Sequence, residues 1–158
     1  RFDEALDRFQ AAELIARDQN DEEALARALA GKGNSLLKSG RAQLALEPLE
    51  TALEINTRMN ASDGIGISAG LLARARLEGG DTGAAARAAR QALESSQTST
   101  NLTGLATAKW VLAQVDRAEQ RLVTANQLFE EAVSLAQRSG NVNLARAIES
   151  DYSRETAT

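Results

Sequence analysis

The sequence predicts an all-α protein that forms an α-solenoid, a stack of antiparallel helix hairpins with about eight helices. Apolar residues make up 43% of the chain but aromatic residues only 3%, so the interior consists mainly of Ala and Leu, which suits closely packed helices. The chain holds one Pro and few β-branched runs, and no segment is typical of a β-strand. Small and apolar residues also recur forty residues apart, as in a stacked array of repeats.

The repeat is clearest from residue 33 to residue 55, where one helical pattern ends at Gly40 and a second begins at once. Two helices joined by a Gly turn form an αα-hairpin. Residues of similar size follow at intervals of forty: Gly33, Gly40, Ala45, Leu49, Ala52 and Leu53; then Ala73, Gly80, Ala85, Ala89, Ala92 and Leu93; then Ala113, Gln120, Ala125, Phe129, Ala132 and Val133.

This pattern resembles the tetratricopeptide repeat (TPR) family over residues 1 to about 150, in its forty-residue-period variety. The resemblance rests on four positions of each unit. A small residue stands near the end of the first helix, and Ala, a bulky apolar residue and a second Ala follow in the second helix. It implies a right-handed superhelix in which first helices line a concave groove and second helices face outward. The chain departs from the family pattern at the turn of the third unit, where Gln120 replaces Gly, and no aromatic stands at the fourth position of any unit.

The predicted array spans residues 1–158. An orphan second helix occupies residues 1–19, which suggests a segment of a longer protein. Complete repeats follow at 22–57, 62–97 and 101–139, and residues 141–155 form the first helix of a further, truncated repeat. Asp21 is suited to cap a helix. Pro48 falls inside the helix predicted at 42–57, and we expect one helix there because Ala45 and Ala52 flank it in repeat register.

The local sequence of residues 118–122 is compatible with either a turn or a continuous helix. No helix breaker stands between Ala118 and Leu122, so the local sequence permits one continuous helix of almost forty residues. The forty-residue register instead predicts a hairpin turn at Gln120. We favour the turn, because a non-Gly residue in the left-handed region costs only ~1–2 kcal/mol, which a well-packed hairpin can offset.

Charge and composition exclude several classes of function. The net charge of −4 argues against a nucleic-acid partner, and no window approaches the ~18 apolar residues of a membrane span. The chain has neither Cys nor His, which removes thiolate chemistry and the commonest metal ligand and acid–base group. We therefore expect no enzymatic activity, no cofactor and no metal, and the absence of Cys is compatible with a cytoplasmic location.

Two short motifs have structural rather than chemical interpretations. The acidic residues Asp18, Asp21, Glu22 and Glu23 lack the alternating ligands and central Gly of a calcium loop, so we expect them to cap and solvate a helix start. The run Gly31-Lys32-Gly33 lacks the strand and spacing of a phosphate-binding loop. It predicts close helix packing, with Lys32 extending to solvent.

Candidate groove residues follow from the same register. Asn34, Arg74 and Gln114 are forty residues apart and should form a polar row, either along the groove or on an unused surface. Trp110 occupies a position that lines the groove in the family, with packing between helices as the alternative. The family's clamp for a C-terminal carboxylate is not expected, because only Asn34 fits it.

The predicted function is a scaffold that binds a peptide segment of another protein in the concave groove. The alternative is an effector-sensing superhelical module of a bacterial multidomain signalling or transcription regulator, and the neighbouring domains would distinguish the two. We also expect end-to-end self-association, because Phe9 and Leu14 at one end and Leu144 and Ile148 at the other are predicted to expose apolar surface.

Overall fold

The computed structural model describes residues 2–156, and the side chains of residues 3–153. Within this part of the chain it contains eight α-helices and no strand, which confirms the predicted all-α class. The helices are α1 (Phe2–Asp18), α2 (Glu22–Lys38), α3 (Ala42–Arg58), α4 (Ser62–Glu78), α5 (Thr82–Thr98), α6 (Leu102–Ala118), α7 (Leu122–Arg138) and α8 (Val142–Thr156).

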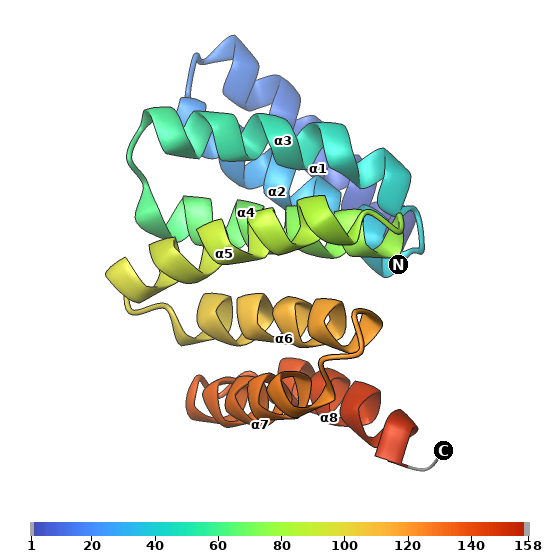
Figure 1. The fold of residues 1–158 in the computed structure, drawn as a ribbon. Helices are drawn as coiled ribbons and strands as arrows, with labels where there is room; N and C mark the ends of the chain where they lie inside the picture. Colours follow the sequence, from blue (N-terminus) through green and yellow to red (C-terminus); the bar gives the residue numbers. More distant parts are fainter. Residues whose placement is uncertain (1, 157–158) are drawn as a thin grey trace.

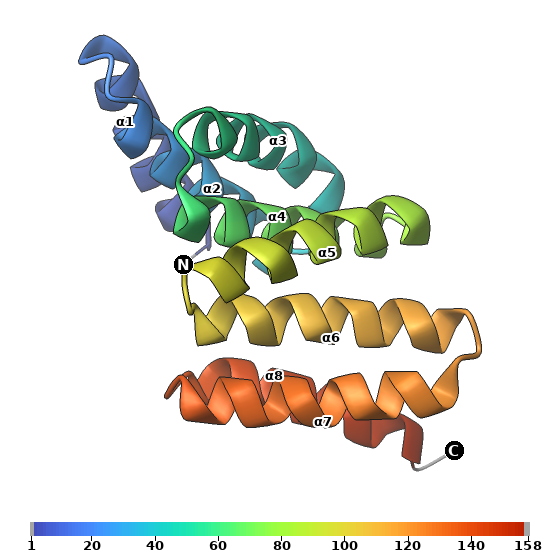
Figure 2. The same cartoon turned by 60° about the vertical axis from the view of Figure 1, so that its left-hand side comes forward.

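Each helix packs against the next one in the chain, so that the helices form a stack from α1–α3 to α7–α8 (Figures 1 and 2). The even-numbered helices also meet one another, since α4 contacts both α2 and α6. Among the described residues the odd-numbered helices form no comparable contacts with one another. The even-numbered helices are therefore the closely spaced inner layer, and the odd-numbered helices form the outer layer.

All seven turns between the helices have the same backbone structure. Each turn contains one residue with positive φ, and these residues are spaced twenty apart: Asn20, Gly40, Asn60, Gly80, Thr100, Gln120 and Gly140. The amide of the following residue donates to the carbonyl five residues earlier, as Arg41 N does to Leu36 O at 2.8 Å. This is a Schellman motif, which satisfies carbonyls at the helix end. Gln120 has φ +62°, so the predicted hairpin turn between α6 and α7 is confirmed.

Thr100 is the most strained of the turn residues. It adopts φ +59°, and a β-branched side chain in this region is a genuine outlier. We expect Thr100→Gly to raise the free energy of unfolding by about 1 kcal/mol, because glycine adopts this conformation without steric cost. Chemical denaturation measures the change. Gly40→Ala is the matched control and should lower stability, since φ is +72° and no neighbouring atom limits the space there. A change in the free energy of unfolding in the same direction for both variants would contradict the strain assigned to Thr100.

Asp21 caps its helix as predicted, and other helix starts are capped in the same way. The side chains of Asp21 and Asp81 accept hydrogen bonds from the amides of Ala24 and Ala84 at 2.9 and 2.8 Å. Asn101 caps α6 in the same way. The described residues hold no group of three potential metal-ligating side chains, and Asp21 in the acidic run acts as a cap.

Small residues lie where the helices approach most closely. The alanines at the two repeat positions of the second helices are buried: Ala45, Ala85, Ala125, Ala52, Ala92 and Ala132. A Cβ atom at Gly31 would lie 2.2 Å from the Phe9 ring, and one at Gly33 would lie 2.4 Å from Leu49. The Gly-Lys-Gly run is therefore a close-packing site, as predicted. Pro48 is buried inside one uninterrupted helix, α3, which confirms the prediction for that segment.

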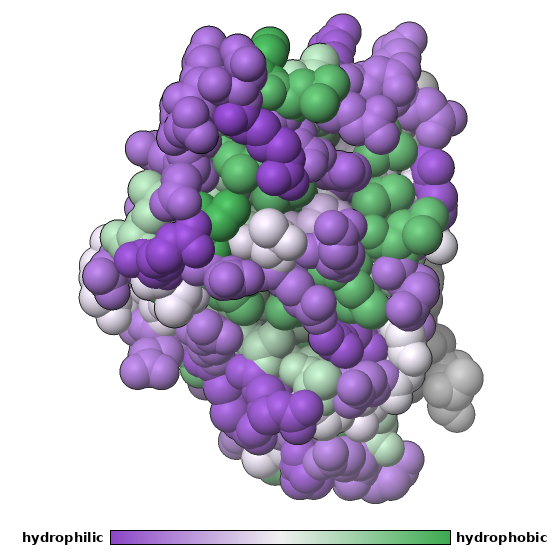
Figure 3. Space-filling view, turned by 90° about the horizontal axis from the view of Figure 1, so that it is seen from above, coloured by the Kyte–Doolittle hydropathy of each residue, from purple (hydrophilic) through white to green (hydrophobic). Residues whose placement is uncertain are grey.

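The apolar surface predicted at the N-terminal end is partly wrong, because Phe9 is half-buried against Gly31 of α2 whereas Leu14 is exposed as expected. Ala12 is exposed, and 69% of the Leu14 surface is accessible. Ala52 occupies the position equivalent to Ala12 and is fully buried, because α3 packs on both α2 and α4. By contrast, α1 packs chiefly on α2. Figure 3, which views the stack from the end formed by α1 and α3, shows hydrophobic atoms exposed among hydrophilic ones.

The apolar surface predicted at the other end is also partly wrong. Ile148 is 0% exposed and Leu144 is half-buried. Both belong to a cluster with Phe129, because α8 packs back on α7 and buries this face itself. Self-association remains a prediction, and Leu14 and Ile15 of α1 are the exposed apolar side chains that favour it.

Lys32 does not extend freely to solvent as the sequence predicted. Its Nζ atom lies 3.1 Å from Glu13 Oε2, and Arg17 approaches the other carboxylate oxygen at 3.0 Å. Burial by itself raises the pKa of Glu13, but hydrogen bonds from Lys32 and Arg17 outweigh it and hold this pKa below its usual range. The half-buried stem of Lys32 therefore ends at a carboxylate of α1 and ties α2 to it.

This ion pair predicts a pH-dependent contribution to stability. The pKa of Glu13 is lower in the folded state, so ionised Glu13 stabilises the fold above about pH 4.3 and loses this effect as the pH falls through the folded pKa. We expect Glu13→Gln to reduce the free energy of unfolding near pH 7, with a difference from the parent chain that shrinks below about pH 4. Urea titrations across this range measure it. Glu54→Gln, at an exposed site on α3, should show no such trend.

Candidate functional site

The four candidate groove residues all lie on the inner layer. Asn34 belongs to α2, Arg74 to α4, and Trp110 and Gln114 to α6. Arg74, Trp110 and Gln114 surround one hollow of about 190 Å³, which we call the arginine hollow. Leu77 and Glu78 complete it. Asn34 is not part of this group and lines a neighbouring hollow, so the structure brings three of the four residues together.

The neighbouring hollow has about 250 Å³ and is lined by residues of α2, α4 and α6. We call it the glycine hollow because three of its lining residues are glycines. Its lining residues are Asn34, Gly66, Ile67, Gly70, Leu71, Asn101, Thr103, Gly104 and Thr107. The two hollows follow each other along α4, since Gly70 lines the first and Arg74 lines the second. Together they form a candidate ligand groove across three inner helices.

Two of the expected donors of the arginine hollow are already bound to a carboxylate of the chain itself. Trp110 Nε1 and Gln114 Nε2 both donate to Asp151 Oδ2 of α8, each at 2.7 Å. Arg117 lies 3.4 Å from the other oxygen, Asp151 Oδ1. These two donors were expected to face a ligand, and instead they hold α8 against α6. The reason is tertiary, because α8 packs on α7 and brings Asp151 within hydrogen-bond distance of α6.

Arg74 differs from these donors. Its guanidinium group lies over the Trp110 ring, 5.5 Å from the centroid, and 23% of its side chain is exposed. Glu78 is 3.9 Å away, and Arg74 donates no hydrogen bond within the described residues. Burial lowers the pKa of Arg74 from its usual range, while the charge of Glu78 opposes this change. The structure thus presents a largely buried cation whose N–H groups are available to an acceptor.

Two glycines of the glycine hollow leave room for a side chain of α5. A Cβ at Gly66 would lie 2.5 Å from Ser96 Oγ, and one at Gly104 would lie 2.2 Å from the same atom. Ser96 of α5 is 0% exposed, and its hydroxyl has no hydrogen-bond partner in the described part of the chain. The hydroxyl therefore lies directly behind the floor of the hollow. A buried hydroxyl without a hydrogen-bond partner lowers the stability of the fold, so its position needs a structural or functional explanation.

Sequence reasoning missed Asp151, Gly66 and Gly70. A signal for Asp151 was present, because it lies eighty residues after Leu71, which lines the glycine hollow. Gly66 and Gly70 are spaced four apart, which places them on one face of a helix. Glycines inside a helix lower its stability, so a reason in packing or function was to be expected for them.

Larger hollows exist elsewhere but are weaker candidates. One of about 410 Å³ lies at the turn between α1 and α2, and one of about 430 Å³ lies between α6 and α7. In the second, Lys109 and Glu131 already pair with each other at 2.5 Å. Each of these hollows belongs to a single pair of helices, whereas the candidate groove spans three inner helices.

The fold and the groove define the chain as an all-α helical repeat with hollows on its inner layer. Comparison with protein-family models finds no match, and comparison with curated protein sequences finds none either. No helix among the described residues is long and apolar enough to cross a membrane.

Proposed function

We propose that this chain is a protein–protein interaction scaffold that binds a peptide segment of another protein along its inner layer. The observation that carries the proposal is the pair of adjacent hollows, which open on consecutive inner helices and run along α4. Stacked helix hairpins bind extended or helical peptides on such a surface. The resemblance to TPR arrays supports the same function, with a cytoplasmic location and no catalytic role.

The mechanism depends on shape and on preformed side chains. The helices of the inner layer hold their side chains in a fixed row, so little order has to be gained when a peptide binds. Trp110 is held by its hydrogen bond to Asp151, and Arg74 rests on the Trp110 ring. Arg and Trp are the residue types that most often dominate binding energy at interfaces.

A random peptide library displayed on phage tests the proposal, because no partner has to be known in advance. We expect selected peptides, once synthesised, to protect backbone amides of α2, α4 and α6 from hydrogen exchange, with little effect on α1 and α7. Arg74→Ala should reduce affinity by about 2 kcal/mol or more. Trp110→Phe keeps a ring and removes the Nε1 donor, and should weaken binding less. Failure to select any binder, or protection confined to the outer layer, would contradict the proposal.

The second candidate is an effector-sensing module of a bacterial multidomain signalling or transcription regulator. The glycine hollow favours it, because a small molecule there would contact α2, α4 and α6 together and could change the spacing of three inner helices. A screen of metabolite-sized compounds for increased thermal stability tests this candidate. Compounds that stabilise the parent chain but not Gly70→Leu would support it, and an attached nucleotide-binding or DNA-binding domain would favour it further.

A further inference from the structure

We propose that the groove recognises a two-point motif in its peptide ligand, an apolar side chain for the glycine hollow and a carboxylate for Arg74. This inference rests on the proposed peptide-binding function and specifies the chemistry of the partner. The two points follow from different observations, one of shape and one of charge.

The glycine hollow fits an apolar side chain. Ile67 and Leu71 supply apolar walls, and Gly70 contributes no side chain that would fill the hollow. A hollow of about 250 Å³ exceeds the volume of a single aliphatic side chain and leaves room for the adjoining backbone. Asn34 and Asn101 add amide groups to the lining, which can pair with that backbone.

Two of the glycines are needed for packing and one is not. The space at Gly66 and Gly104 is taken by Ser96, so glycine there is required by the fold itself. At Gly70 a Cβ would meet Thr107 Cγ2 at 3.6 Å and Ala92 Cβ at 3.9 Å, which are ordinary contacts. The fold therefore does not require glycine at residue 70, although glycine in a helix interior costs about 0.5–1 kcal/mol relative to alanine. A hollow that must stay open for a ligand explains why glycine stands at residue 70.

Arg74 supplies the second point. It is a largely buried cation without a hydrogen-bond acceptor, and its nearest carboxylate, that of Glu78, is 3.9 Å away and belongs to a side chain that is 42% exposed. A carboxylate that enters the arginine hollow would gain charge-assisted hydrogen bonds from the guanidinium group. The chain itself shows carboxylate binding next to this hollow, since Trp110 and Gln114, which line it, both donate to Asp151.

The separation of the two points limits the spacing of the motif. Gly70 and Arg74 are one helical turn apart on α4, which corresponds to ~6 Å along the axis. Side chains at i and i+3 or i+4 of a helical ligand lie ~5–6 Å apart. Side chains at i and i+2 of an extended ligand lie ~7 Å apart. We therefore expect an aliphatic residue and an Asp or Glu separated by two to four positions.

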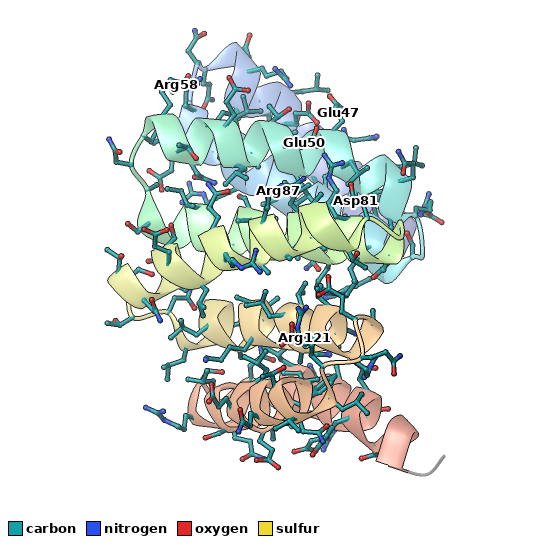
Figure 4. All side chains as sticks on the ribbon, viewed as in Figure 1. Glu47, Glu50, Arg58, Asp81, Arg87 and Arg121 are labelled. Atoms are coloured by element: carbon teal, nitrogen blue, oxygen red, sulfur yellow. The ribbon has the colours of Figure 1, made fainter. Side chains whose placement is uncertain are left out.

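The test uses peptides selected from a random library with the intact chain as bait. Aligned sequences should show an aliphatic residue with Asp or Glu two to four positions away. Arg74→Gln should weaken such peptides about tenfold or more, and replacing their acidic residue by its amide should have little further effect on that variant. Arg87→Gln is the matched control, since Arg87 lies exposed on the outer helix α5 (Figure 4).

Substitutions at Gly70 test the apolar point of the motif independently of Arg74. Gly70→Ala should keep or raise the melting temperature and should weaken binding, and Gly70→Leu should weaken it further, by about tenfold or more. Gly83→Ala is the control on α5, where a Cβ makes only contacts of 3.6 Å and longer. If Gly70→Leu does not fold, Gly70→Ala still decides, because its melting temperature reports on folding separately from binding.

The outcomes separate this inference from the function on which it rests. Peptides that bind the inner layer without an acidic residue, and with equal affinity for Arg74→Gln, would overturn the carboxylate point and leave the scaffold function standing. Unchanged affinity in Gly70→Ala and in a folded Gly70→Leu would overturn the apolar point. Absence of any inner-layer binder would overturn both the motif and the scaffold.

Discussion

Phe129→Ala is expected to lower the free energy of unfolding by about 3–5 kcal/mol, the largest effect of any single substitution considered for this chain. Phe129 is 1% exposed, stacks on Tyr152 with 5.2 Å between ring centroids, and lies under the Arg117 guanidinium group at 5.0 Å. It thus joins α6, α7 and α8, and its removal leaves a cavity between three helices. Urea denaturation followed by circular dichroism measures the loss.

The position of Phe129 also predicts where the structure opens. Stability in a repeat array is approximately a sum of units and of interfaces between neighbours. In Phe129→Ala the amides of α7 and α8 should therefore exchange hydrogen faster, while those of α2–α4 change little. Phe129→Leu is the control and should cost less than about 1.5 kcal/mol, because Leu49 occupies the equivalent position in another repeat. Equal losses for the Ala and Leu variants would show that no specific cavity forms.

Ala85→Leu and Ala92→Leu are each expected to destabilise the fold by about 1–3 kcal/mol through overpacking. Both residues are fully buried between helices, and Ala92 belongs to a buried cluster with Ala69 of α4 and Ala108 of α6. A leucine side chain has no room there unless α4 and α5 separate. Their equivalents in the other hairpins, Ala45 and Ala132 among them, are buried in the same way.

Ala84 gives the matched control for these substitutions. It is adjacent to Ala85 but only half-buried, and it lines an open hollow between α4 and α5 that has room for a larger side chain, so Ala84→Leu should stay within about 0.5 kcal/mol of the parent chain. Thermal melts of the three variants side by side make the comparison. Indistinguishable melting temperatures would contradict the packing register of the repeat.

The sequence by itself determined the class, the number of helices and the places where they turn. These features are encoded in local sequence patterns, such as a small residue where two helices cross or a residue suited to positive φ at a helix end. Such signals recur along the chain, and repetition made even the turn at Gln120 predictable without a glycine. The placement of Arg74, Trp110 and Gln114 on the inner layer follows from the same register.

Only the tertiary structure decided which of these side chains has an available donor. Asp151 lies forty-one residues from Trp110 and binds both Trp110 and Gln114, so Arg74 alone of the three keeps its N–H groups for a ligand. The tertiary structure likewise buried Ile148, which was expected to expose apolar surface at the end of the array, because α8 packs back on α7. The physical reason is common to both, because burial and pairing depend on which neighbouring helix covers a face, and a local pattern does not contain that neighbour.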